Sequence, residues 1–310
     1  MTGTAAGPVA GAEVVEVADG VFAYVQSDGS WWVNTTGFIP GAGHVLAIDA
    51  CATERRTRAL LAAIDATTAA PVQTLINTHY HGDHTYGNSL FAATTTVVGH
   101  ERCRAGMLAD TFLAQTPPLW QPSPPWGDLS IRPPEVTFTD RLTVWVDELA
   151  VELHHAGGRA HTDSDIVAWL PERGVLFTGD LIFNGGTPML LMGSVTGYLA
   201  ALERIRAIGA TVLVPGHGRP CGPEVFDTHV RYARFVLAAA EQGRSAGLSP
   251  LETARQLDLG EFAELLDPER IALNLHRAYA DLDGVDEVDL AAAFGDVIAY
   301  NGGRPMRCIA

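Results

Sequence analysis

Four metal-binding side chains stand within six consecutive positions in the first third of the chain. His79, His81, Asp83 and His84 follow directly after an apolar run at 72–76, which the pattern predicts to be a buried strand. In an extended segment, side chains two residues apart point the same way, so His79 and His81 can converge on one ion while Asp83 and His84 turn toward a second. Because buried polar groups seldom crowd this densely without a ligand, the spacing predicts a site for two metal ions.

Three more candidate ligands lie in glycine-containing turns or at the ends of predicted strands. They are His161, Asp180 and His217. Loops that follow strands are where a scaffold presents functional groups. Each of the three taken alone would more simply be a structural turn residue. Together with the first four, however, they complete a set of seven metal-binding side chains.

Two divalent ions held this way would support hydrolysis. A water placed between them has its pKa lowered toward neutrality, and the same ions can polarise a carbonyl and stabilise an oxyanion. Thioesters, esters, amides and phosphodiesters are therefore all candidate substrates. Asp83 is the candidate catalytic residue, because its carboxylate can orient the water and accept its proton. Imidazole suits zinc and iron alike, so the residue types leave the metal open.

The elements around these residues alternate between short strands and helices. The first half predicts strands near 14–25, 32–39, 44–49 and 72–76 and a helix at 53–67. The second half repeats the plan with strands near 136–138, 142–146, 150–154, 166–170, 174–178 and 212–214 and a helix at 198–208. The proline-rich stretch 115–134 excludes a helix or central strand, which indicates an ordered loop or lid.

From residue 223 onward the pattern is helical, with candidate helices at 224–242, 250–257, 269–282 and 288–300. This tail carries no dense ligand motif. It could pack on the core, form a homo-oligomer or shape the pocket. We therefore expect a catalytic domain at 13–222 and a helical C-terminal extension, packed on that core, at 223–310.

Composition excludes several classes of function. The 310 residues are 47% hydrophobic, enough for a sizeable core, and the net charge of -16 argues against nucleic acid or anionic lipid as a partner. The first 13 residues lack the charge and apolar core of a signal peptide, and no uncharged run is long enough to span a bilayer. The four cysteines are widely scattered, which fits reduced thiols. We expect a cytoplasmic protein.

The order of the motifs resembles the metallo-β-lactamase superfamily, whose signature is H-x-H-x-D-H followed by a later histidine, an aspartate and a final histidine. The resemblance spans about residues 13–222. It implies an αββα sandwich with the site along one edge. It also implies two zinc ions, with iron or manganese as alternatives. One ion would be held by His79, His81 and His161, the other by Asp83, His84 and His217, and Asp180 would bridge both.

Several features narrow the choice among the branches of this superfamily. The start of the chain does not look like that of a secreted β-lactamase, and His81 stands where flavodiiron oxidoreductases have a glutamate. Glyoxalase II shares all seven ligands, so a glyoxalase II-like or general thioester or ester hydrolase stays open. A mononuclear iron persulfide dioxygenase, which leaves the second metal site empty, is a further alternative. A metal-stabilised binding protein without catalytic activity is the non-enzymatic one.

The whole chain is also similar to the second-ring cyclase/thioesterases of aromatic (type II) polyketide biosynthesis, of the actinorhodin-pathway type. The segments that carry this likeness are 145–153, 161–165, 274–278 and 301–303. The likeness implies closure of a second ring and hydrolysis of the thioester that links the polyketide to an acyl carrier protein. Such carriers are acidic, so docking to an acidic enzyme would need a local arginine patch.

A reactive polyketone needs an apolar cavity that limits contact with water. Large apolar side chains gather in the stretches 115–134 and 183–197 and in the pair Trp31 and Trp32. Each of them could equally be ordinary core packing. The candidate pocket residues are Trp31, Trp32, Trp120, Trp126, Phe183, Met189 and Met192.

Overall fold

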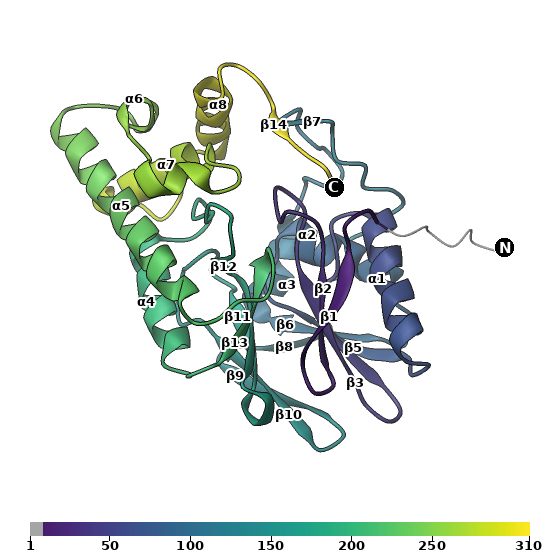
Figure 1. Ribbon diagram of the computed structural model, residues 1–310. Coiled ribbons are helices and arrows are strands. Elements are labelled where there is room, and N and C mark those ends of the chain that lie inside the picture. Colours follow the sequence, from purple (N-terminus) through teal and green to yellow (C-terminus); the bar gives the residue numbers. More distant parts are fainter. Residues whose placement is uncertain (1–8) are drawn as a thin grey trace.

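Two β-sheets pack face to face, and helices cover the outer face of each (Figure 1). The computed structural model describes residues 9–310. The predicted αββα sandwich with C-terminal helices is confirmed. None of the helices within 9–310 is long and apolar enough to cross a lipid bilayer.

The first sheet has seven strands in the order β1-β2-β3-β4-β5-β6-β8. Their bounds are β1 Glu13–Ala18, β2 Val21–Val25, β3 Thr36–Pro40, β4 Val45–Ile48, β5 Val72–Asn77, β6 Thr96–His100 and β8 Val136–Phe138. Neighbours are antiparallel from β1 to β4 and parallel from β4 onward. The outer face is covered by α1 (Glu54–Thr67), which begins where the Thr53 side chain accepts a hydrogen bond from the Arg56 amide.

The second sheet has five strands in the order β13-β12-β11-β10-β9. Their bounds are β9 Arg141–Val146, β10 Leu149–His155, β11 Ile166–Leu170, β12 Val175–Phe183 and β13 Val212–His217. Only β12 and β13 are parallel.

Short helices connect some of the strands. In the first sheet, α2 (Gly82–Thr85) follows β5 and α3 (Glu101–Ala109) follows β6. Elsewhere 3₁₀ turns occupy Tyr86–Leu90, Pro171–Arg173 and Gly260–Glu264.

A buried apolar layer joins the two sheets. It contains Ile39, Leu46 and Ile76 from the first sheet together with Val151 and Phe177 from the second. The sheets approach so closely at Gly37 that an added Cβ would lie 2.1 Å from the Phe177 ring. Burial of these side chains is the main stabilising contribution to the sandwich, at roughly 1.5–3 kcal/mol for each large residue.

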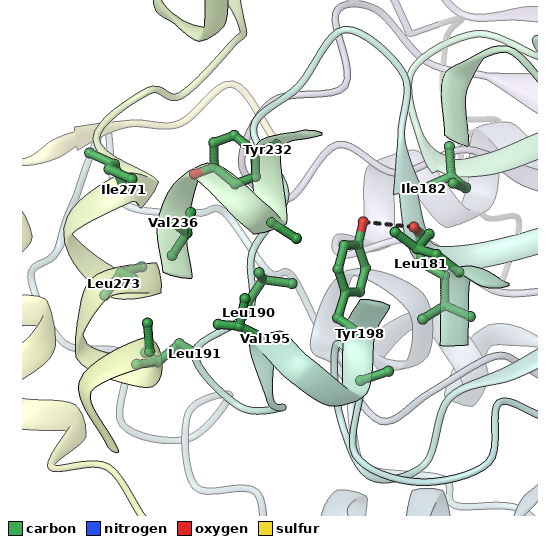
Figure 2. Close-up of a cluster of buried hydrophobic side chains, with 14 of the residues drawn as sticks. Leu181, Ile182, Leu190, Leu191, Val195, Tyr198, Tyr232, Val236, Ile271 and Leu273 are labelled. Atoms are coloured by element: carbon green, nitrogen blue, oxygen red, sulfur yellow. Dashed lines mark hydrogen bonds between the residues drawn. The ribbon is translucent and has the colours of Figure 1, made fainter. Parts of the chain in front are cut away.

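Helices α4 (Val195–Arg206) and α5 (Val225–Ser245) pack on β12 of the second sheet. The later helices pack on these two and on one another; their bounds are α6 Pro250–Gln256, α7 Arg270–Asp283 and α8 Leu290–Tyr300. Figure 2 shows the buried cluster in which α4, α5 and α7 meet, with Leu190, Val236 and Leu273 among its members. The Tyr198 hydroxyl of α4 donates a 2.9 Å hydrogen bond to the Leu181 carbonyl in β12 (Figure 2). This cluster fixes the helical extension to the strand that carries Asp180.

The two-residue strands β7 (Trp120–Gln121) and β14 (Met306–Arg307) pair in parallel. β7 lies in the proline-rich loop, and β14 follows α8, so the loop is tied to a segment from the far end of the chain (Figure 1). The predicted loop is thus ordered by pairing with a strand that the local sequence pattern did not reveal.

Two predicted strands have different bounds in the structure. The strand expected at 32–39 begins only at Thr36, because Trp32 adopts a left-handed backbone with φ 66° and breaks the extended run. The strand expected at 174–178 continues through Asp180 to Phe183, with a change of register around Gly179, where φ is 51°. Asp180 therefore lies within a strand rather than at its end.

Candidate metal centre

All seven predicted ligands meet at one edge of the sandwich, where loops and strand ends of both sheets converge. His79 and His81 follow β5, and Asp83 and His84 lie in the helical turn α2. The second sheet supplies His161 from the loop between β10 and β11, Asp180 from β12, and His217 as the last residue of β13. The helical turn reverses the direction of the chain after His81, so Asp83 and His84 reach a different place from the two preceding histidines.

The potential ligand atoms form two groups that share Asp180. In each group these atoms lie within 4.8 Å of one another. One group is His79, His81, His161 and Asp180, and the other is Asp83, His84, Asp180 and His217. This grouping has the membership expected for two ions bridged by one carboxylate.

Distances around Asp180 show how tightly the centre is built. Its Oδ1 lies 3.1 Å from His84 Nε2, and its Oδ2 lies 3.3 Å from His161 Nε2 and 3.4 Å from His217 Nε2. Asp83 Oδ2 lies 3.2 Å from His217 Nε2. So many acceptors and ring nitrogens in so small a volume need cations between them or protons on some of them.

Unpartnered buried atoms indicate that divalent cations fit this centre. His79 Nε2, His84 Nε2 and Asp180 Oδ1 are buried and make no hydrogen bond. A buried polar atom without a partner is costly, whereas imidazole nitrogens and carboxylate oxygens are the preferred ligands of zinc and similar ions. The chemistry of the donor set therefore fits divalent metal ions.

The outward ring nitrogens are held by hydrogen bonds that leave the opposite nitrogen free for a metal. His161 Nδ1 lies 2.6 Å from the Met189 carbonyl, and His217 Nδ1 lies 3.0 Å from the carbonyls of Gly29 and Val33. Since a carbonyl only accepts, each Nδ1 carries a proton, and Nε2 is the ring nitrogen turned toward the centre, where it can bind a metal once it carries no proton.

Asp49 is a functional residue that the sequence analysis missed. Its carboxylate is buried and accepts hydrogen bonds from the Thr78 amide (2.8 Å), the Thr78 hydroxyl (2.7 Å) and His84 Nδ1 (2.8 Å). It thereby fixes the tautomer of His84 and the backbone just before His79. The available signal was an aspartate directly after an apolar strand, which is common at structural turns as well.

The direction of the pKa shift divides four histidines of the centre into two classes. Burial lowers the pKa of His79 well below its ordinary value and that of His81 to about 3, and the neighbouring histidines add to the effect. Burial alone would also lower the pKa of His84 and His217, but the carboxylates of Asp180 and Asp83 outweigh it. They raise the pKa of His217 to about 9 and that of His84 well above 6.5.

Both carboxylates of the centre are held as anions. Burial would raise the pKa of Asp83, but the charge of His84 and the hydrogen bond from His217 lower it to about 2. The pKa of Asp180 is likewise lowered well below its ordinary value, because His217 and His84 outweigh the effect of burial. Anionic carboxylates and neutral imidazoles are the forms that bind metal.

A cavity of 410 Å³ opens beside the centre. His81, Asp83, Asp180 and His217 lie in its wall, so a bound molecule would reach the predicted ligands directly. Its other walls are mainly aromatic and apolar. The residues not predicted for it include Tyr80, Tyr86, Phe112, Arg270, Leu290 and Phe294.

Six of the seven predicted pocket residues line this cavity. They are Trp31, Trp32, Trp120, Phe183, Met189 and Met192. Trp126 does not line it. That side chain packs behind Trp32, with ring centroids 4.8 Å apart, and its indole N–H donates to the Thr116 hydroxyl. Sequence showed that the proline-rich loop carries two tryptophans, but not which of them faces inward.

A sequence model of the metallo-beta-lactamase superfamily matches residues 29–217, and the chain belongs to this superfamily. The match includes all seven residues of the centre. The chain is thus a metal-binding hydrolase of the metallo-β-lactamase fold, with a histidine and aspartate cluster able to hold divalent ions.

Curated relatives cover most of the chain at low identity. The chain is 27% identical over 223 residues to a type 2 metallo-beta-lactamase of Bacteroides fragilis, covering 69% of this chain and 82% of the relative. It is 26% identical over 268 residues to a hydroxyacylglutathione hydrolase of Methylococcus capsulatus, covering 82% and 88%. The solved metallo-beta-lactamase from Pontibacter korlensis superposes with a TM-score of 0.60 at 20% identity, covering 72% of this chain and 99% of that one. The structural likeness supports the fold.

Proposed function

We propose that this enzyme is a dinuclear metal hydrolase/cyclase that acts on an aromatic polyketide attached by a thioester to an acyl carrier protein. It would close the second ring and cleave the thioester. The observation that carries the proposal is the position of the metal centre in the wall of an apolar, largely aromatic cavity. A cavity of this size accommodates a small-molecule acyl group, and its lining suits flat, multi-ring substrates.

Two zinc ions are the proposed cofactors, with iron or manganese as alternatives. His79, His81 and His161 would hold one ion, Asp83, His84 and His217 the other, and Asp180 both. When bound, the ions polarise a carbonyl and lower the pKa of a water. These are the two effects that thioester hydrolysis and ketone activation require.

The protein side chains supply proton transfer and exclusion of bulk water. The Asp83 carboxylate lines the cavity and is anionic, so it can orient the attacking water and accept its proton. The oxygen of that water bonds to the acyl carbon, the carbon–sulfur bond breaks, and the departing thiolate takes up the proton. Trp31, Trp32 and Trp120 keep the cavity apolar, which limits unwanted cyclisation of the polyketone.

A glyoxalase II-like hydrolase is the second candidate, because relatives of that name match most of the chain. The cavity wall argues against it. Arg270 is the one arginine among the residues that line it, and its guanidinium already pairs with Asp267. The two carboxylates of a glutathione thioester would therefore find no unpaired arginine in this wall. Convergence of four residues at the second group also argues for two ions over the single iron of a persulfide dioxygenase.

The test compares an aromatic polyketide-like acyl thioester, a hydroxyacyl-glutathione thioester and acetyl-CoA as substrates. We expect preference for the aromatic thioester, two metal ions per chain, and a fall in kcat of about 10²–10⁴ for Asp83→Ala. Asp19→Ala, at an aspartate whose side chain is 93% exposed, is the control. Preference for hydroxyacyl-glutathione would favour the second candidate, and one iron per chain with oxygen uptake would overturn both.

A further inference from the structure

Arg270, the first residue of α7, is buried beside the metal centre. It is 2% exposed and lines the cavity together with His217. Its guanidinium lies over two aromatic rings, 4.2 Å from the centroid of Trp31 and 5.3 Å from that of Phe183. Burial of an arginine is costly unless its charge and donors are used, so this position calls for a specific reason.

Hydrogen bonds hold the guanidinium in place. Nη1 donates to the Thr187 carbonyl at 2.9 Å, and Nη2 donates to Asp267 Oδ2 at 2.8 Å. The planar group is thus fixed at one side by a carbonyl and a carboxylate, and its faces are available to the rings. Arginine is suited to this arrangement because it stacks flat on aromatic rings, which lysine does not.

Two residues just before Arg270 in the sequence accept hydrogen bonds from the same tryptophan, Trp31. Asp267 Oδ2 accepts a 3.1 Å hydrogen bond from the Trp31 amide, and Glu269 Oε1 accepts a 2.9 Å hydrogen bond from the Trp31 indole. The start of α7 therefore holds Trp31 by its backbone, its ring edge and its ring face. A wall of the cavity is set by the helical extension, not by the sandwich alone.

Phe183 lies between Arg270 and the metal centre and contacts both. Its ring stacks on His217 with centroids 4.9 Å apart and planes inclined by 9°. The Nδ1 of His217 in turn bonds to the carbonyls of Gly29 and Val33, on either side of Trp31. Arg270 thus contacts both a cavity wall and the ring packed on a predicted ligand.

We propose that Arg270 is a positioning residue that gives the cavity its selectivity for aromatic acyl groups by fixing Trp31 and Phe183. It acts through these two rings, over which its guanidinium lies. Its kinetic test rests on the proposed thioesterase function, whereas its effect on metal binding at His217 is measured independently.

The chain offers a matched control in Arg277. It lies in the same helix, is also 2% exposed, pairs with Asp281 at 2.9 Å and donates to the carbonyls of Val285 and Asp286. It does not line the cavity. Arg277→Met therefore removes an equally buried guanidinium without touching the site.

The variants Arg270→Met and Arg270→Lys are compared with Arg277→Met on an aromatic and an acetyl thioester. In both Arg270 variants we expect the ratio of kcat/KM for aromatic over acetyl substrate to fall about tenfold, mostly through KM, the size that loss of a desolvated cation–π contact implies. Lysine preserves the charge next to Asp267 but cannot stack flat on the rings, so Arg270→Lys should not restore the wild-type substrate ratio. Arg277→Met should lower the Tm and leave the ratio unchanged.

Metal affinity gives the independent readout. Chelator competition should show that Arg270→Met binds the ion held by Asp83, His84 and His217 more weakly than wild type does. In Arg277→Met the affinity for that ion should be unchanged. A substrate ratio within twofold of wild type in both Arg270 variants would overturn the selectivity role. If the wild type cleaves no thioester, the proposed function fails, and unchanged metal affinity in both Arg270 variants would then overturn the positioning role as well.

Discussion

Asp49→Asn is the substitution that most directly tests how the centre is built. Asp49 Oδ1 accepts from the Thr78 amide, and Oδ2 accepts from the Thr78 hydroxyl and from His84 Nδ1. An asparagine has one accepting oxygen in place of two. If that oxygen faces the Thr78 amide, the side-chain NH₂ group meets the His84 Nδ1 proton. If it faces His84, the NH₂ group meets the Thr78 amide.

Either orientation leaves one buried donor without an acceptor, which costs about 1–3 kcal/mol. In the first orientation the NH₂ group can bond only to a deprotonated Nδ1, which leaves the ring proton on Nε2, the atom that faces Asp180 at 3.1 Å. A protonated Nε2 has no lone pair for a metal. Loss of such an outer hydrogen bond lowers metal affinity by about 10–100-fold, or about 1.4–2.8 kcal/mol.

The assay is chelator competition for the second ion, combined with thermal unfolding in the presence and absence of metal. Asp281→Asn is the control, since Asp281 accepts from the Val195 amide and the Ser194 hydroxyl and has no hydrogen bond to Thr78 or His84. It should lose stability and keep the affinity for the ion held by Asp83, His84 and His217. Wild-type affinity in Asp49→Asn would refute the reasoning that Asp49 sets the tautomer of His84.

Two further predictions concern protons and packing at the centre. The pKa of His217 is raised to about 9 and that of His84 well above 6.5, so a metal must displace protons from both at lower pH, and affinity should rise at least tenfold per pH unit up to about pH 9. Calorimetry in buffers of different ionisation enthalpy should detect the released protons, and their absence would contradict the prediction. By linkage the metal-free fold is stabilised by the proton on His217 below about pH 6.5 and loses that stability as pH rises to 9. A Cβ at Gly193 would lie 1.7 Å from the Ala160 carbonyl oxygen, so Gly193→Ala should displace the loop that carries His161. The variant should have a lower Tm and a lower affinity for the ion held by His79, His81 and His161. Gly295→Ala is the control and should change neither, because the space around Gly295 is open.

The fold and the grouping of candidate ligands were predictable for different reasons. Strand and helix patterns are local, and apolar alternation followed by a helical tail identified the layers of the sandwich. The motif from His79 to His84 places four ligand types so close together in sequence that they must be close in space. His161, Asp180 and His217 were candidates because they lie in glycine turns or at predicted strand ends, and the resemblance to a known superfamily then assigned them to particular ions.

Other parts of the site depend on contacts that no local pattern encodes. Asp49 looks like any polar residue after a strand, and its role appears only when Thr78 and His84 are seen around it. Arg270 reaches Trp31 across most of the chain. Trp120 and Trp126 stand in the same loop, yet only Trp120 faces the cavity, because the pairing of β7 with β14 decides which side turns inward.

The β7–β14 pair also sets an order of assembly during synthesis. All seven residues of the centre have left the ribosome once His217 has emerged, so a nascent chain could already bind metal. Trp120, however, pairs with Met306 and is held against the cavity only after the whole helical extension has followed. Synthesis therefore supplies all seven ligand candidates before the strand that pairs with Trp120.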